Sequence, residues 1–157
     1  HRFFIQVIGI RGKSAKRNSP GLDRENCQLS PREWLDTIPA VAEAVARLGI
    51  ITSYPKVFLR PEDPFACAGI EAENYFIFPN GRVYRCPLCE DYPLHSLEFK
   101  DGLLTATEKI NESDLFPLEI PEGCVMNKLL QPGNLSYRPD GTPRYKIACC
   151  MLKEEVG

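Results

Sequence analysis

Tyr75-Phe-Ile-Phe-Pro-Asn-Gly-Arg-Val-Tyr-Arg-Cys86 is the stretch that decides the expected fold of this 157-residue chain. Two runs of aromatic and β-branched residues flank Asn80-Gly81, a dipeptide that supplies the positive φ values of a tight turn. The stretch therefore predicts a β-hairpin. Residues 94–107, which turn at Asp101-Gly102, predict a second hairpin. We expect the part of the chain that contains them to be rich in hairpins.

Cysteines surround the first hairpin and recur toward the C-terminus. The chain has seven, an odd number that cannot pair completely within it. Cys67 and Cys86 flank the hairpin, which brings its two ends together, and Cys89 forms a C-x-x-C pair with Cys86. Four thiolates suffice for a zinc or iron–sulfur site, and clustered thiols in a reducing compartment more often bind metal than form disulfides. The candidate metal ligands, of which four are expected to serve, are Cys67, Cys86, Cys89, Cys124, Cys149 and Cys150.

The N-terminal part has a different pattern. The apolar run of residues 2–10 predicts a buried strand, and the polar residues 11–28 predict a loop. Ser30-Pro31 and Glu33 form a capping box that starts a helix, which Gly49 should end and Pro39 should kink or divide. Residues 50–57 predict the next strand. Strand, helix and strand in this order form one parallel crossover unit, which cannot be stable alone.

The hairpin and its cysteines resemble a known arrangement. Cys67-x13-Gly81-x4-Cys86 resembles the start of the SPASM or twitch extension of radical S-adenosylmethionine (SAM) enzymes. In that family such a hairpin begins an auxiliary iron–sulfur site appended to a partial (β/α)6 barrel. The resemblance implies an α/β fold: an incomplete, TIM-type barrel segment over residues 1–62, and a hairpin-rich, cysteine-rich cluster domain over residues 63–157. It covers the second part specifically through Cys86 and the first part more loosely.

Two departures from the family pattern shape the expectation. The family holds its SAM-binding cluster with a CxxxCxxC motif, which this chain lacks, so the N-terminal half of the barrel is expected to be missing or SAM cleavage to be impossible. The second-cluster run of a full SPASM domain is also absent. One twitch-like auxiliary [4Fe–4S] cluster is therefore expected, with Cys67, Cys86 and Cys124 as ligands. Cys149 or Cys150 completes the set, and Cys89 is the rival for the last place.

The resemblance also gives the expected partners. Arg11 follows the first strand and would face the SAM or substrate side of the barrel, because barrel active sites lie at the C-terminal ends of strands. Cys27 is expected to be a bystander in the same loop. The parent protein would be an oxidoreductase that acts on a peptide or a small molecule. The auxiliary cluster would transfer electrons or bind substrate, and whether this chain is itself an enzyme stays open.

Composition excludes several other classes. Lys and Arg number 19 against 21 Asp and Glu, with a pI near 5.8, so a nucleic-acid partner is not expected. No apolar run reaches the length of a membrane span, and no export signal is visible, so a cytoplasmic location is expected. The alternative function is a structural zinc module that mediates interactions. A thiol-rich domain without metal is the third hypothesis.

Overall fold

The computed structural model describes residues 1–6, 29–71, 73–90, 92–149 and 151–157. The expectations for the loop of residues 11–28, and those for Arg11, Cys27 and Cys150, lie outside the described residues. The chain forms two compact units: one combines residues 1–58 with residues 150–157, and the other spans residues 59–149. Within the described part of the chain, no helix has the length and apolar character needed to cross a membrane.

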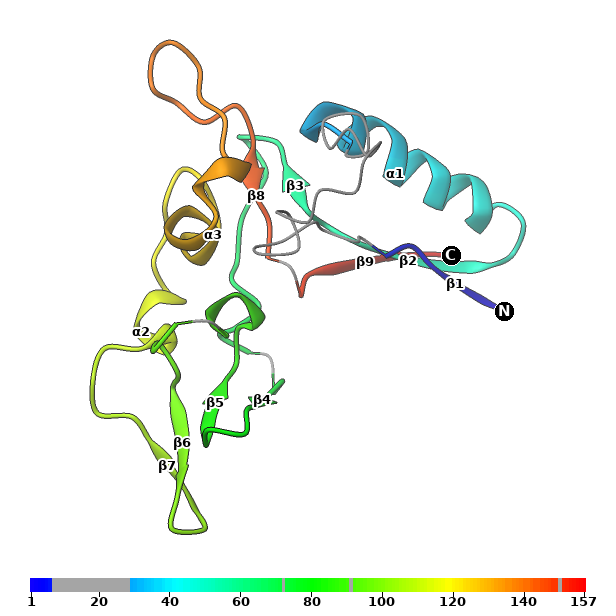
Figure 1. Cartoon of the computed structure of the whole chain (residues 1–157). Coiled ribbons are helices and arrows are strands. Elements are labelled where there is room, and N and C mark those ends of the chain that lie inside the picture. The colour runs from blue at the N-terminus through cyan, green and yellow to red at the C-terminus, as the bar shows by residue number, and fades with distance from the viewer. Residues whose placement is uncertain (7–28, 72, 91, 150) are drawn as a thin grey trace, which may run out of the picture. The chain divides into compact units, whose positions relative to one another are not determined.

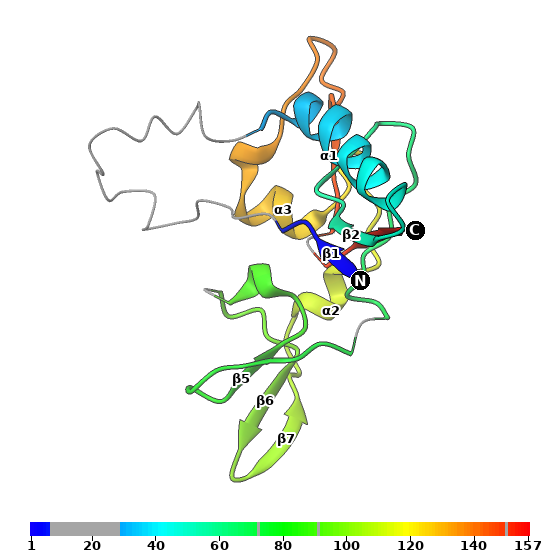
Figure 2. The same ribbon diagram turned by 90° about the vertical axis from the view of Figure 1, so that its right-hand side faces the viewer.

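The first unit contains a three-stranded sheet with one helix against it. Its strands are β1 (Arg2–Phe4), β2 (Ile51–Pro55) and β9 (Lys153–Val156), in the order β1-β2-β9. The pairing of β1 with β2 is parallel, which confirms that prediction, whereas β9 pairs antiparallel with β2. Helix α1 (Pro31–Ala46) packs along β2 (Figure 2). No pattern in the sequence predicts that the C-terminal residues return to pair with β2.

Helix α1 begins as the sequence predicts. Ser30 accepts a hydrogen bond from the Glu33 backbone, and the Glu33 side chain accepts one from the Ser30 backbone. Pro39 does not divide the helix, which continues to Ala46. A proline removes only one hydrogen bond of the helical ladder, and packing against the sheet holds the remainder. Trp34 is buried and meets the Phe58 ring edge to face.

The second unit contains the two predicted hairpins. The strands β4 (Phe76–Ile77), β5 (Arg82–Tyr84), β6 (Leu97–Lys100) and β7 (Leu103–Ala106) form an antiparallel sheet in sequence order (Figure 1). Gly81 has a φ of 83°, and a Cβ placed there would lie 2.8 Å from the Phe99 carbonyl oxygen. Only glycine suits both the turn and this close approach to β6.

Short elements complete the second unit around these hairpins. A 3₁₀ turn, η3 (Pro87–Cys89), follows β5, and α2 (Glu112–Leu115) follows β7. Helix α3 (Val125–Leu130) and a second 3₁₀ turn, η4 (Pro132–Asn134), lead to β8 (Lys146–Ile147), which pairs with β3 (Phe58–Leu59).

Candidate thiolate site

Cys124 is positioned by backbone hydrogen bonds to β8. The Cys124 N–H donates to the Ile147 carbonyl at 3.0 Å, and the Ile147 N–H donates to the Glu122 carbonyl at 2.9 Å. Between them, Gly123 has a φ of 84°, and a Cβ on it would lie 2.6 Å from the Ile147 oxygen. Two segments more than 20 residues apart in sequence therefore run side by side. Their parallel bridge carries the chain on to Cys124 on one side and to Cys149 on the other.

Cys86 and Cys89 lie at the two ends of a tight turn. The Cys89 N–H donates to the Cys86 carbonyl at 3.1 Å, which closes the 3₁₀ turn η3. Both side chains are buried. The turn brings the two sulfurs together, and the Cys86 thiol donates a hydrogen bond to Cys89. The C-x-x-C spacing thus forms a pair of adjacent thiols.

Cys67 joins the site from a third segment. Its carbonyl accepts a hydrogen bond from the Ile70 N–H at 3.1 Å, and its thiol donates to the Cys149 sulfur. Cys67 and Cys124 line the same small cavity, of about 10 Å³, which is partly open to solvent. The other lining residues are apolar or aromatic: Phe65, Leu115, Phe116, Leu118, Val125 and Met126.

Cys67, Cys86 and Cys124 keep their protons at neutral pH. The hydrogen bond to Cys149 and burial raise the pKa of the Cys67 thiol far above its usual value, and the hydrogen bond to Cys89 and burial do the same for Cys86. Burial raises the pKa of the Cys124 thiol to about 11, although its sulfur accepts a hydrogen bond from the Asn127 N–H at 3.4 Å. Cys149 and Cys86 also raise the pKa of the Cys124 thiol electrostatically, so both lie near it.

The donors suit a soft metal or an iron–sulfur cluster. All five described candidate cysteines belong to the second unit, and none of them forms a disulfide. Buried thiols that raise each other's pKa would gain most from a cation that binds them as thiolates. Among the described residues, however, no group of three or more His, Cys, Asp or Glu side chains is arranged to hold a metal ion. The structure therefore shows the donors in one region but no ready-made coordination sphere among them.

Glu112 is a site residue that the sequence did not single out. Its side chain is completely buried, and it accepts hydrogen bonds from the backbone of Arg85 and Cys86 and from the Ser96 hydroxyl. The sequence signal nearby is Asn111, which begins α2 and forms a capping box with Asp114. That signal locates the helix, but it does not reveal that Glu112 reaches β5.

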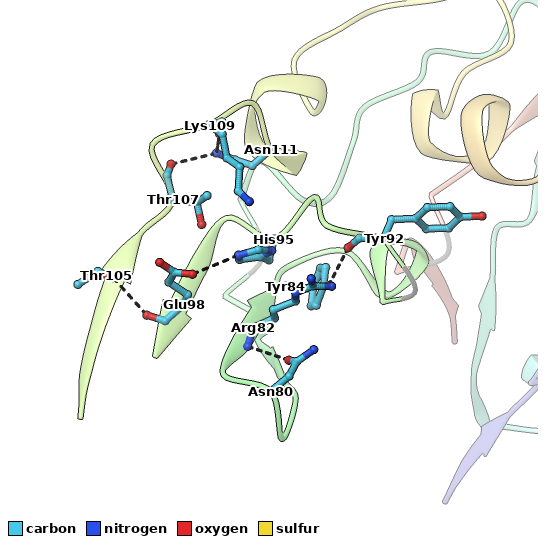
Figure 3. Close-up of polar contacts among 10 residues, drawn as sticks. All are labelled: Asn80, Arg82, Tyr84, Tyr92, His95, Glu98, Thr105, Thr107, Lys109 and Asn111. Atoms are coloured by element: carbon cyan, nitrogen blue, oxygen red, sulfur yellow. Dashed lines mark hydrogen bonds and ion pairs between the residues drawn. The ribbon is translucent and has the colours of Figure 1, made fainter. Parts of the chain in front are cut away.

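His95 lies two residues before β6 and contacts residues of the hairpin sheet. Its ring is buried and meets Tyr84 edge to face with centroids 5.9 Å apart. Figure 3 shows its Nε2 toward the Glu98 carboxylate, at 3.6 Å, and the Tyr84 hydroxyl donating to the Tyr92 carbonyl at 2.7 Å. These contacts place His95 in the packing of β5 against β6.

Alkaline pH is expected to destabilise the chelator-treated chain. The folded state holds the Cys124 proton up to a pKa of about 11, whereas the unfolded thiol has a pKa near 9.0. Below pH 9 both states are protonated and this contribution to stability is complete; it is lost as the pH rises from 9 to 11. The loss due to Cys124 is about 2–3 kcal/mol. Urea unfolding at pH 8 and at pH 11 measures the free energy of unfolding, whose difference between the two pH values should be smaller in Cys124→Ala. The same difference in Cys124→Ala as in the wild type would contradict the prediction.

Comparisons of the chain with protein-family models, with curated proteins and with solved structures give no match.

Proposed function

We propose that the second unit binds one auxiliary [4Fe–4S] cluster, and that the chain is the C-terminal part of a radical SAM oxidoreductase. The observation that carries the proposal is the gathering of five cysteines, four of them buried and Cys67 half-buried, from four separate segments of one unit. Cys67 precedes the first hairpin, and Cys86 and Cys89 lie at the two ends of the η3 turn. Cys124 and Cys149 follow the two residues joined by the bridge between Gly123 and Ile147. Cysteine is the residue that ligates iron–sulfur clusters.

The proposed ligands are Cys67, Cys86, Cys124 and Cys149. They come from four segments of the second unit, and Cys67 and Cys124 line one small cavity. Cys89 remains the rival for one place because it is the hydrogen-bonding partner of Cys86, and Cys150 remains in the proposed set by its sequence position. When bound, the cluster would supply one-electron chemistry or an iron for substrate binding. The protein would hold it in an apolar pocket, which limits the access of water and tunes its potential.

The first unit supports the barrel part of the proposal. All three residues of β1 are exposed, and two of them are Phe3 and Phe4. In the described part of the chain, β2 lies on one side of β1 and no strand lies on the other. We propose that further barrel strands cover this edge in the parent protein and that Arg11 faces SAM or substrate there. The substrate would be a peptide or a small molecule, and the location cytoplasmic, where thiols stay reduced.

Anaerobic reconstitution with iron and sulfide tests the proposed function. The full chain should turn brown, absorb broadly in the blue, and bind about four iron and four sulfide ions. A variant with alanine at Cys67, Cys86 and Cys124 is the control and should remain colourless. Two results would overturn the cluster proposal. One is iron content no higher than in this control; the other is stoichiometric zinc that resists replacement by iron, which is the outcome that a structural zinc module predicts.

A further inference from the structure

Cys86 and Cys89 are held at the two ends of a single backbone turn. The Cys89 N–H donates to the Cys86 carbonyl at 3.1 Å, which is the i to i+3 hydrogen bond that closes η3. A turn closed in this way holds its first and fourth Cα atoms less than about 7 Å apart, and a disulfide needs a Cα separation of about 4.4–6.8 Å. The backbone thus places the two cysteines within the range of a disulfide.

The turn is fixed at its start and at its end. Pro87 is the first residue of η3, where the proline ring restricts φ to a value that suits the turn. On one side, the Cys86 N–H donates to Glu112 Oε2 at 2.8 Å. On the other side, the Tyr92 N–H donates to the Cys89 carbonyl at 2.9 Å. These backbone contacts keep the two cysteines as neighbours, and the Cys86 thiol donates a hydrogen bond to Cys89.

Two adjacent thiols have a chemistry that a single buried thiol lacks. Both cysteines are reduced in this structure, and Cys86 is 6% exposed whereas Cys89 is 0% exposed. A single buried thiol is inert and has no second sulfur beside it to displace a bound reagent. In an adjacent pair, the second thiol attacks the mixed disulfide formed by the first and completes an internal bond. Burial makes the first attack depend on local opening of the turn.

We infer that Cys86 and Cys89 form a redox-sensitive dithiol, which a small disulfide such as oxidised glutathione converts to an intramolecular disulfide. Cys86, the more exposed of the two, gives up its thiol proton and attacks one sulfur of the reagent. The other sulfur of the reagent takes up the proton and leaves as a thiol. Cys89 then attacks the sulfur of Cys86 and releases the second reagent thiol in the same way. The pair loses two electrons and two protons, and one reagent disulfide becomes two thiols.

The inference rests on the thiols of the chain alone and does not depend on the proposed cluster. Oxidised glutathione added to the chelator-treated wild type therefore tests it, whatever the result of reconstitution with iron. Trypsin cuts after Arg85 and Lys100 and releases residues 86–100, which contain Cys86 and Cys89 and no other cysteine. After oxidation this peptide should lack two hydrogens and resist alkylation, and dithiothreitol should restore both thiols. A peptide that stays reduced, or that is joined to another cysteine, would overturn the inference.

The contribution of the folded turn is measured by titration against the ratio of reduced to oxidised glutathione. The equilibrium constant for the Cys86–Cys89 bond should be at least about tenfold larger in the folded chain than in urea, because the fold holds the two sulfurs adjacent. Equal constants in the two states would show that the fold does not prepare the pair, and would overturn the inference. These measurements use the wild type, so they decide it even where a variant does not fold.

Serine variants test the order of attack. In Cys89→Ser the mixed disulfide lacks its partner, so glutathione should stay attached to Cys86. In Cys86→Ser, glutathione should attach to Cys89 at least about tenfold more slowly, because Cys89 is completely buried. Equal rates of attachment would overturn the assigned order. Cys124→Ser is the matched control: it removes another thiol near Cys86 and should leave formation of the disulfide unchanged.

Discussion

Alanine at Cys86 is expected to reduce the iron retained by the reconstituted chain to the background level. Cys86 is buried, is fixed through its backbone by Glu112, and lies at the end of the hairpin where two segments meet. Loss of one thiolate leaves an iron of the cluster without a protein ligand, and a partly ligated cluster is easily lost to chelators. Iron and sulfide contents after desalting, together with the absorption in the blue, measure the effect.

The same substitution at Cys27 is the control for this prediction. Cys27 is outside the proposed ligand set, so Cys27→Ala should keep the iron content of the wild type. Cys89→Ala then separates the two candidates for the last place. Full retention of iron in Cys89→Ala excludes Cys89 as a ligand, and retention in Cys86→Ala would contradict the proposed site.

Alanine at Gly123 is expected to destabilise the chain by about 3 kcal/mol or more, from two separate causes. A positive φ costs an L-residue about 1–2 kcal/mol. The added Cβ would also lie 2.6 Å from the Ile147 carbonyl oxygen, which is backbone and cannot turn away. Relief of this clash would break the hydrogen bonds that join Glu122 and Cys124 to β8, at about 0.5–1.5 kcal/mol each. Urea unfolding of the metal-free chain measures the loss.

Gly141 provides a matched control for the Gly123 variant. It has a φ of 82°, close to the 84° of Gly123, but nothing lies within 4 Å of a Cβ added to it. Gly141→Ala should therefore cost only the strain of the positive φ, about 1–2 kcal/mol. Equal losses in the two variants would show that the contact with β8 contributes nothing. The Gly123 variant should also lose cluster binding, because it separates Cys124 from the strand that leads to Cys149.

The features that the sequence predicted correctly depend on neighbours in the chain. Asn80-Gly81 and Asp101-Gly102 specify their turns because few residues tolerate the required φ values, and both hairpins formed as expected. Ser30 and Glu33 satisfy each other within one helical turn, so the start of α1 was readable without knowledge of the fold. The C-x-x-C spacing likewise forms a thiol pair through one local turn.

The tertiary structure decided which distant segments meet. Residues 153–156 could complete the first sheet only because the chain returns to β2, and no local pattern encodes such a pairing. Cys67 meets Cys149, 82 positions later in the chain, and Gly123 forms a bridge to Ile147 of β8, two residues before Cys149. The burial of Glu112 is of the same kind, since a surface-type residue becomes the central acceptor only when β5, β6 and α2 converge on it. The sequence by itself thus determined the local elements and the thiol chemistry. Burial and long-range hydrogen bonds, which arise only as those elements pack, determined which thiols lie close together and how Glu112 is buried.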